Sequence, residues 1–251
     1  MPPGWRMKLG EASLNQELGP QTYTDQLERT RWGQYLTQVE EHVLTAALDL
    51  LGEPGSALEM GCASGRWSSR LVERGWKVTC VDIEESALQI CQQRIPSANC
   101  ILARPNDRTI PSPDRAFKLI LCIEVEAVLH SDWFLDEAHR VLVDGGCVIS
   151  TMTNRSSVRA LPHQFLEGWR ANSQRFRPGP PSYKTSYRAW RQTLLRKGFT
   201  TVGAQGCCWF PFQRNSNSVL VKLVTQFEKA LGLRRLTGFS PWIVSAAQKT
   251  L

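Results

Sequence analysis

Short apolar runs rich in β-branched residues alternate with helically spaced apolar positions from residue 56 onward. Five runs have the length of buried strands, and three segments between them place apolar residues three and four positions apart. Strands that are apolar on both faces and separated by helices are typical of a parallel sheet covered on each side. The sequence therefore predicts a doubly wound α/β domain. The predicted strands are 56–60, 77–83, 98–103, 117–125 and 147–153, and the predicted helices are 67–74, 84–94 and 133–142.

The segments on either side of this pattern predict a helical cap and a second lobe. Apolar positions from 35 to 51 fit one amphipathic helix that packs against the sheet or covers the site. A Pro- and Gly-rich stretch at 175–186 breaks the downstream pattern. The helix that follows is expected to end at Gly198, because glycine readily adopts a left-handed cap. The further predicted elements are the helix 187–197, the strand 199–209, the helix 219–233 and the strand 239–247.

These patterns divide the chain into three predicted parts. They are an N-terminal helical cap (1–55), a core (56–154) and a C-terminal lobe that completes the sheet (155–251).

The composition places the chain among compact globular proteins. It has 251 residues, of which 42% are hydrophobic and 21% are charged, enough for a full core. No run reaches the roughly 18 apolar residues of a spanning helix, and the N-terminus lacks the apolar core of a signal peptide. The eight cysteines show no CxxC spacing and are interpreted as reduced core residues. We therefore expect a soluble, cytoplasmic protein.

The net charge of +7 is unevenly distributed. Residues 155–251 carry 16 basic and 2 acidic side chains, whereas residues 1–154 carry 14 basic and 21 acidic ones. Such a split indicates that the C-terminal lobe faces something anionic, such as an acidic substrate, a nucleic acid or a membrane surface. A solvated basic face that keeps the protein soluble is the simpler interpretation.

The first predicted strand leads into a loop suited to a nucleotide or nucleoside. Residues 57–68 read ALEMGCASGRWS, in which a strand ends in an acid, turns at small residues and enters a helix. Such a loop lets its backbone approach a ligand, and the helix N-terminus offers unpaired N–H groups. Asp82 ends the next strand, where a carboxylate can accept hydrogen bonds from both ribose hydroxyls. The sequence therefore predicts a pocket at the carboxyl ends of these strands.

The spacing of small residues in the loop separates two classes of cofactor. The pattern is Glu59-x-Gly61-x-Ala63-x-Gly65 and not the G-x-G-x-x-G that wraps a pyrophosphate. An acid before the first glycine opposes the negative charge of a pyrophosphate. A sulfonium cofactor with a free amino group suits that acid better.

The segment from Ala57 to Arg94 resembles the first two motifs of the class I S-adenosylmethionine-dependent methyltransferases, specifically the small-molecule group that includes ubiquinone-type O-methyltransferases. The resemblance continues through IPSPDRAFKLILCIEVEAVLHSDWFLDEAHRVLVDGGCVISTMTNR, and more loosely through both flanks. It implies a Rossmann-like, seven-stranded sheet whose last strand is antiparallel. It also implies the cofactor S-adenosyl-L-methionine, the product S-adenosyl-L-homocysteine and no metal.

The resemblance assigns roles to individual residues of this chain. Glu59, Gly61 and Gly65, with Cys62 and Ala63 between them, would shape the pocket for the methionine end. Asp82 would hold the ribose, and Ile83 would lie against the adenine. The remaining residues implied at the cofactor are Asn106 or Asp107 near the adenine amino group, Cys122, Ile123 and Glu124 along the fourth strand, and Trp32 and Tyr35 closing over it from the N-terminal segment.

Three positions depart from the family pattern. Ala63 stands where the family has its middle glycine, which adds a methyl group next to the cofactor. Pro105-Asn106-Asp107 stands in place of the Gly-Asp-Ala loop, so either Asn106 or Asp107 must serve. The Glu-His pair after the fourth strand is replaced by Ala127-Val128, which puts a family-like base in doubt.

Two candidates remain for a general base. His130 lies between the fourth strand and the next helix, and its reference pKa suits proton transfer near neutral pH. A helix-entry residue hydrogen-bonded to Asp132 is the competing interpretation. Glu124 and Glu126 form the second option, because strand alternation predicts that they point to the same side. A phenol or alcohol acceptor needs a base, whereas a neutral amine or a carboxylate does not.

We expect a small-molecule acceptor, anionic or aromatic, methylated on oxygen or, second, on nitrogen. Aromatic and basic residues interleave from Trp169 to Arg191, either as an aromatic pocket with an anion clamp or as a core stripe with solvated arginines. The alternatives are a protein that binds the cofactor without turnover, and an enzyme directed at RNA or lipid. We do not expect nucleic acid as a partner, because the Asn/Asp-Pro-Pro-aromatic motif is absent after the fourth strand. The helix 219–233 packs over the site or rests on an anionic membrane.

Overall fold

A computed structural model describes residues 27–160, 185–213 and 216–250 of the chain. Its centre is a seven-stranded sheet in the order β3-β2-β1-β4-β5-β7-β6. The strands β1 to β5 pair in parallel, whereas β7 is antiparallel to both β5 and β6. The strands are β1 (Ser56–Met60), β2 (Lys77–Asp82), β3 (Asn99–Leu102), β4 (Phe117–Cys122), β5 (Leu142–Thr153), β6 (Phe199–Cys207) and β7 (Trp242–Lys249). The predicted seven strands and the antiparallel last strand are confirmed.

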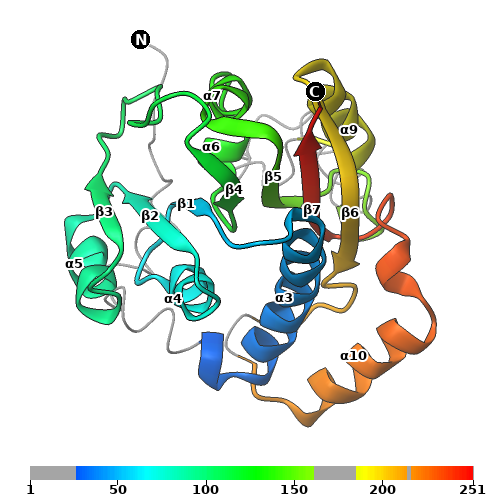
Figure 1. Cartoon of the computed structure of the whole chain (residues 1–251). Coiled ribbons are helices and arrows are strands. Elements are labelled where there is room, and N and C mark those ends of the chain that lie inside the picture. Colours follow the sequence, from blue (N-terminus) through cyan, green and yellow to red (C-terminus); the bar gives the residue numbers. More distant parts are fainter. Residues whose placement is uncertain (1–26, 161–184, 214–215, 251) are drawn as a thin grey trace, which may run out of the picture.

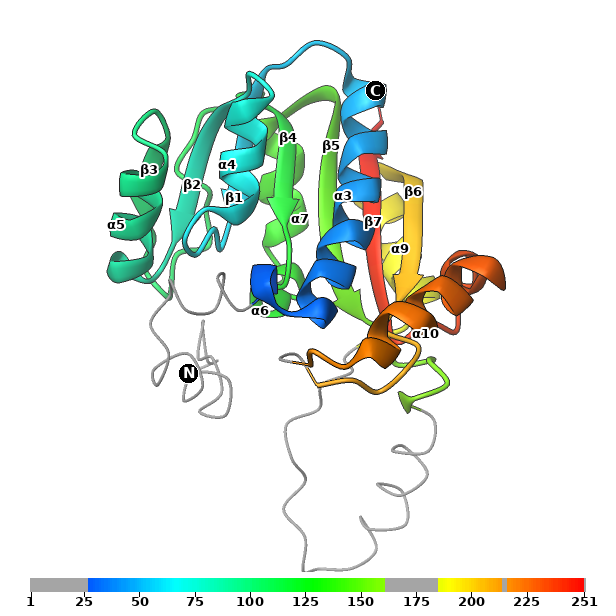
Figure 2. The same ribbon diagram turned by 90° about the horizontal axis from the view of Figure 1, so that it is seen from below.

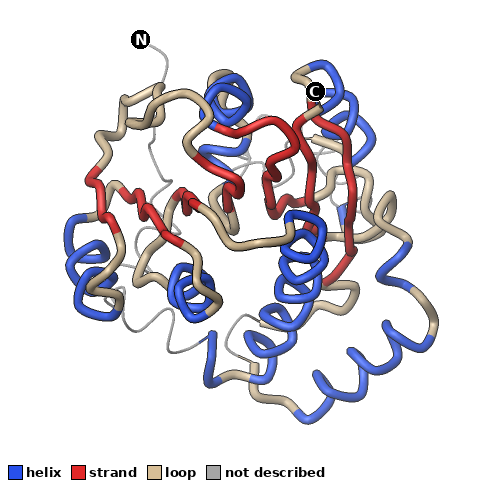
Figure 3. The backbone as a smooth tube through the Cα atoms, viewed as in Figure 1, coloured by secondary structure: helices blue, strands red, loops and turns tan. Residues whose placement is uncertain are grey.

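Helices cover both faces of the sheet, as the buried strands require. Figures 1 and 3 show α3, α4 and α5 on one face and α6, α7 and α9 on the other. A separate cluster of buried apolar side chains lies on each face. The helices are α3 (Arg31–Leu51), α4 (Arg66–Glu73), α5 (Glu85–Arg94), α6 (Glu126–Leu129), α7 (Phe134–Val141), α9 (Tyr187–Arg196), α10 (Val219–Ala230) and the short 3-10 helix η1 (Leu233–Arg235).

Local signals fix the ends of the longer helices. The Thr30 hydroxyl accepts a hydrogen bond from the backbone N–H of Gly33, which caps α3 at its start, and Gly52 follows its end with φ +70°. Ser186 caps α9 in the same way, by accepting from the N–H of Ala189. Gly198 has φ +77°, which confirms the left-handed position predicted there.

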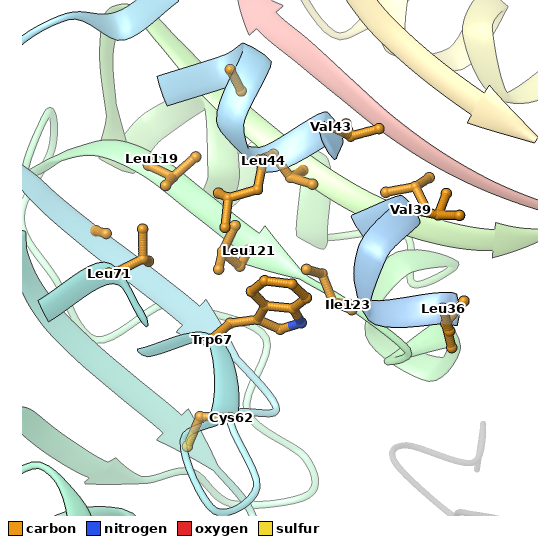
Figure 4. Close-up of a cluster of buried hydrophobic side chains, with 14 of the residues drawn as sticks. Leu36, Val39, Val43, Leu44, Cys62, Trp67, Leu71, Leu119, Leu121 and Ile123 are labelled. Carbon is orange, nitrogen blue, oxygen red and sulfur yellow. The ribbon is translucent and has the colours of Figure 1, made fainter. Parts of the chain in front are cut away.

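Helix α3 joins the core across the middle of the sheet. Its buried residues include Leu36, Val39 and Leu44, and they pack with Leu119 and Leu121 of β4. Figure 4 shows Trp67 of α4 lying within this cluster. The helical segment upstream of the sheet is thus part of the same core as the strands. The three-part division at residues 55 and 154 stays a prediction.

The structure corrects one element of the sequence interpretation. The predicted strand 117–125 ends at Cys122, and the chain then turns through Glu124, which has φ +60°. Glu126 already begins α6. Strand alternation therefore does not relate Glu124 to Glu126. The turn falls at Glu124, and apolar residues stand on both sides of it, so the pattern alone does not reveal the end of the strand.

Candidate functional site

The loop between β1 and α4 is held in a tight left-handed conformation. Gly61 has φ +68° and Gly65 has φ +80°. A Cβ atom at Gly61 would lie 2.5 Å from a methyl carbon of Val125, and one at Gly65 would lie 2.7 Å from the sulfur of Cys91. Both positions therefore require glycine, for backbone conformation and for space. The loop is also tied to β2, because the N–H groups of Gly61 and Cys62 donate to the carbonyl of Val81.

Ala63 lies at the middle of the loop in a conformation that favours glycine. Its φ is +47°, and it is one of four residues other than glycine with positive φ among the described residues. Its methyl group stands where the resembling family has no side chain. The substitution therefore combines backbone strain with extra bulk at the loop.

Asp82 braces two loops at the carboxyl edge of the sheet. One carboxylate oxygen accepts from the N–H of Ala63 at 2.8 Å, and the other accepts from the N–H groups of Ile83 at 2.7 Å and Glu84 at 3.1 Å. Burial raises the pKa of this carboxyl group, against the lowering effect of the three N–H donors. Asp82 thus fixes the loop after β1 and the loop after β2 relative to each other. Ile83 is half-buried beside it.

Glu59 accepts hydrogen bonds from the first turn of α4. Its carboxylate, 4% exposed, accepts from both the backbone N–H and the hydroxyl of Ser68. It takes the place of a capping side chain, since Gly65 at the N-cap position has none. Burial raises the pKa of Glu59 to about 8. The acid therefore shapes the loop by holding the helix N-terminus in position.

A buried cluster of charges joins α3 to this loop. The guanidinium of Arg66, the first residue of α4, donates to the Glu40 carboxylate at 2.9 Å and to the Thr37 hydroxyl at 2.8 Å. A carboxylate oxygen of Glu124 lies 3.9 Å from the same guanidinium. Burial raises the pKa of Glu40 to about 7 despite the neighbouring cation. Arg66 thus links α3, α4 and the turn after β4.

The residues at the end of β4 point in different directions. Cys122 is fully buried and packs in the cluster on the α7 face, whereas Ile123 packs in the opposite cluster, near Trp67. The backbone N–H of Glu124 donates to the hydroxyl of Thr151 on β5. Among these residues, Glu124 is the one whose side chain lies beside the charged cluster.

The first predicted base candidate, His130, lies at the C-cap of α6. Its ring makes an edge-to-face contact with Trp190 of α9, with the ring centroids 6.0 Å apart. The Asp132 side chain, the expected partner in the competing interpretation, forms an ion pair with Arg108. His130 therefore faces α9 on the side of the sheet opposite to α3.

The loop after β3 presents the two alternatives for an adenine contact. Asn106 and Asp107 are both exposed. Asp107 accepts a hydrogen bond from the N–H of Arg104 at 2.8 Å, which closes a turn on its own backbone. The side chain of Asp107 thus stabilises the loop, and Asn106 lies within that turn.

Trp32 and Tyr35 are both buried in the first turns of α3. The Trp32 ring meets Trp242 of β7 edge to face, with centroids 6.3 Å apart. The Tyr35 hydroxyl donates to a Glu228 carboxylate oxygen at 2.6 Å and accepts from the N–H of Cys208 at 2.8 Å. Burial holds the pKa of Tyr35 well above its ordinary value. Their predicted contact with a cofactor stays a prediction.

Three thiols gather beneath the loop. The sulfur atoms of Cys62, Cys80 and Cys91 all lie within 4.8 Å of one another, which makes them the one group in the described residues with the spacing of a metal site. All eight cysteines are free, and seven are buried, as expected of core thiols. The expectation that no metal takes part stays a prediction.

The site contains residues that sequence analysis did not single out. Arg66, Glu40 and Thr37 come from two helices and meet only in the fold. The sequence does show Arg66 directly after the last glycine of the loop. Its partners Glu40 and Thr37 lie 26 and 29 residues away along the chain, so the sequence alone does not reveal the contact. The predicted basic and aromatic residues between Trp169 and Lys184 lie outside the described residues.

Comparison with known proteins places this geometry in a family. Residues 57–146 match the family profile described as a methyltransferase domain. Over 113 residues the chain is 30% identical to the demethylmenaquinone methyltransferase of Tropheryma whipplei, an alignment that covers 44% of this chain and 47% of that protein. Residues 57–146 thus have the sequence of a methyltransferase domain. This confirms the resemblance inferred from the loop and its surroundings.

The alignments with these relatives cover only part of each relative. The Bacillus subtilis protein YqeM is 36% identical over 76 residues, which is 30% of this chain and 31% of that protein. The aligned part spans less than half of either relative. The family assignment thus rests on the cofactor-side half of the sheet.

Solved structures extend the similarity to most of the fold. The magnesium protoporphyrin IX methyltransferase of Synechocystis, solved with S-adenosylhomocysteine, has a TM-score of 0.58 at 14% identity, with 88% of this chain and 86% of that chain covered. A methyltransferase of Methanosarcina mazei has a TM-score of 0.54 at 16% identity, with 81% and 96% covered. These similarities establish the class I methyltransferase fold. In the described part of the chain, no helix is both long and apolar enough to cross a bilayer.

Proposed function

We propose that this protein transfers the methyl group of S-adenosyl-L-methionine to an oxygen, or second a nitrogen, of a small-molecule acceptor. The observation that carries the proposal is the brace between Asp82 and Ala63, which joins the two loops that receive the cofactor. The acceptors in the names of similar proteins are small molecules: demethylmenaquinone, geranyl diphosphate and magnesium protoporphyrin IX.

The residues at the carboxyl edge fit an adenosyl sulfonium. Gly61 and Gly65 let the loop pack tightly on Val125 and Cys91 while its backbone stays in the left-handed conformation. Asp82 has both oxygens at this edge: one accepts a single N–H bond and keeps a lone pair for a ribose hydroxyl, whereas the other already accepts two. Half-buried Ile83 provides an apolar surface for the adenine. When bound, the sulfonium supplies an electrophilic methyl group with a good leaving group.

Two further residues complete the proposed cofactor contacts. Asn106 is the better candidate for the adenine amino group, since the Asp107 carboxylate already holds the backbone of its own turn. Glu59 acts on the methionine end through the first turn of α4, which it holds by way of Ser68. Positioning of the reacting groups supplies several kcal/mol of rate enhancement in such displacements.

Glu124 is the base we propose for an acceptor that carries a proton. It lies in the turn at the carboxyl end of β4 with its carboxylate beside Arg66, whereas the His130 ring is packed against Trp190. A Glu124→Gln variant should then lose kcat on a phenol. An amine acceptor should be methylated at an unchanged rate.

Calorimetry with S-adenosylmethionine and S-adenosylhomocysteine tests the proposed function. We expect binding by the parent, and at least tenfold weaker binding by Asp82→Ala. The matched control is Asp136→Ala, because Asp136 is an exposed carboxylate on α7 that pairs with Lys197. Circular dichroism verifies that each variant is folded. The absence of binding by the folded parent at high micromolar cofactor would overturn the proposal.

A deoxy ligand separates direct contact from loop support. S-Adenosylhomocysteine lacking the ribose 2′-hydroxyl should bind the parent more weakly, yet bind Asp82→Ala as well as the complete ligand does. If removal of the 2′-hydroxyl weakens binding to Asp82→Ala as much as it weakens binding to the parent, Asp82 acts only by supporting the loop. Tight cofactor binding without turnover on phenols, quinols, carboxylates and amines would instead support the alternative of a binding protein without catalysis.

A further inference from the structure

Helix α10 buries a carboxylate against the rest of the fold and exposes a row of large apolar side chains. Its buried residues are Val221 and Glu228, which lie seven positions apart and hence on one side. Leu220, Leu223, Phe227 and Leu231 follow at three- and four-residue spacing and form a stripe. Each of these four side chains is 56–61% exposed. We call these four residues the α10 stripe.

A buried hydrogen-bond network holds the helix in this orientation. The Glu228 carboxylate, 1% exposed, accepts from the Tyr35 hydroxyl at 2.6 Å and from the N–H of Trp209 at 3.2 Å. The same hydroxyl accepts from the N–H of Cys208. Rotating α10 to bury the stripe would break these hydrogen bonds and would leave the Glu228 carboxylate either exposed to water or buried without a donor. The outward apolar side is therefore fixed by the fold.

The surroundings of the stripe carry positive charge and no exposed negative charge in the described residues from 185 onward. Glu228 is the one acidic residue of that part of the chain, and it is buried. Lys222, Lys229 and Arg235 are exposed on α10 and just after it. Basic residues are attracted to an anionic bilayer, and apolar side chains that enter it add to the binding. The charge thus favours an anionic lipid surface as the partner of the stripe.

The length and place of α10 fit a helix lying on a bilayer. Twelve residues extend only about 18 Å, too short for a hydrocarbon core of roughly 30 Å. Figure 2 shows α10 at the end of the molecule where the β5 arrow ends, which is also where α6 and the first turn of α3 lie. The carbonyl of Ser216, just before α10, accepts from the N–H of Trp32. The stripe and the site thus share one end of the molecule.

We propose that the α10 stripe docks this protein onto an anionic lipid bilayer, with the carboxyl edge of the sheet near the headgroups. Docking stands on the exposed stripe and its charge, and it does not depend on methyl transfer. If the proposed function also holds, an acceptor dissolved in the membrane reaches the site from the bilayer.

Flotation of the full chain with vesicles tests the docking. We expect the parent to float with phosphatidylcholine vesicles that contain phosphatidylglycerol, and at least tenfold less with phosphatidylcholine alone. Leu223→Gln/Phe227→Gln should reduce binding to the anionic vesicles at least tenfold. The matched control is Leu195→Gln, since Leu195 is 59% exposed on α9, away from the stripe. The single variants Leu220→Gln and Phe227→Gln repeat the test if the double variant does not fold.

Three results would overturn the proposal. One is a parent that stays unbound with both vesicle types. Another is equal loss of binding in the Leu195→Gln control. The third is a dimer in sedimentation velocity that Leu223→Gln/Phe227→Gln dissociates, without vesicle binding, because a second copy would then cover the stripe. Calorimetry with S-adenosylhomocysteine is run on the same samples, so a failure of docking is distinguishable from a failure of the proposed function.

Discussion

The centre and one edge of the sheet differ in how they place ionisable groups and apolar surface. At the centre, beside β1 and β4, ionisable groups are buried: Glu59, Glu40 and Arg66 lie within the fold. At the β6 edge, α10 exposes leucine and phenylalanine side chains. The buried groups at the centre keep two loops and α3 in one geometry. The exposed apolar groups at the β6 edge contribute little to folding, which supports the docking proposed for them.

The largest expected effect is loss of the Arg66 guanidinium. Arg66→Met should lower the free energy of unfolding by roughly 3–5 kcal/mol, because it leaves the Glu40 carboxylate buried without its cation. Arg70→Met is the matched control: Arg70 is 34% exposed, pairs with Glu41, and should cost less than about 1 kcal/mol. Urea unfolding measures both. If the two variants had equal urea midpoints, the buried Arg66 would be no more important for stability than the surface Arg70.

The pH dependence of stability tests Glu59, the buried acid on β1 at the centre of the sheet. The pKa of Glu59 is raised from 4.5 to about 8, so its contribution to stability is complete below pH 4.5 and is lost as the pH rises through 8. Glu59→Gln should therefore be more stable than the parent at pH 8, on the order of 4 kcal/mol, and converge with it towards pH 4.5. Thermal unfolding across this range measures the difference. A parallel pH profile for the two proteins would contradict the expectation.

A pair of leucines compares apolar side chains at the centre of the sheet and on α10. Leu44→Ala on α3 should cost roughly 2–5 kcal/mol, since Leu44 is fully buried. Leu223→Ala on α10 should change the free energy of unfolding by less than about 0.5 kcal/mol, because the side chain is 56% exposed. Guanidinium unfolding monitors both variants. A large loss in Leu223→Ala would show that the stripe is covered within the chain itself.

The smallest expected effect concerns the strained loop residue. Ala63→Gly should raise the free energy of unfolding by up to about 1 kcal/mol, because glycine adopts φ +47° without a Cβ penalty. The same change removes a methyl group beside the proposed cofactor and should tighten S-adenosylhomocysteine binding. Calorimetry and urea unfolding measure the two effects separately. Weaker binding in the glycine variant would show that the methyl group contacts the ligand favourably.

The cofactor-side loop was predictable because its signals are local. Gly61, Gly65 and Asp82 follow strands whose apolar runs mark their ends, and the structure places them together at one edge. The turn at Glu124 was not predictable in the same way, since apolar residues stand on both sides of it. The partners of Arg66 and the inward orientation of Glu228 were hidden for another reason. They depend on contacts between distant segments, which no local pattern encodes.

The contacts of Arg66 also indicate that a fragment of this chain needs α3 in order to adopt the same fold. Its guanidinium is satisfied by α3, which lies outside the segment matched by the methyltransferase family. An expression fragment starting at β1 would bring this cation and the apolar surface around Leu119 into water. The cooperative unit thus extends beyond the matched segment at its amino-terminal side, and we expect a fragment trimmed to that segment to lose stability.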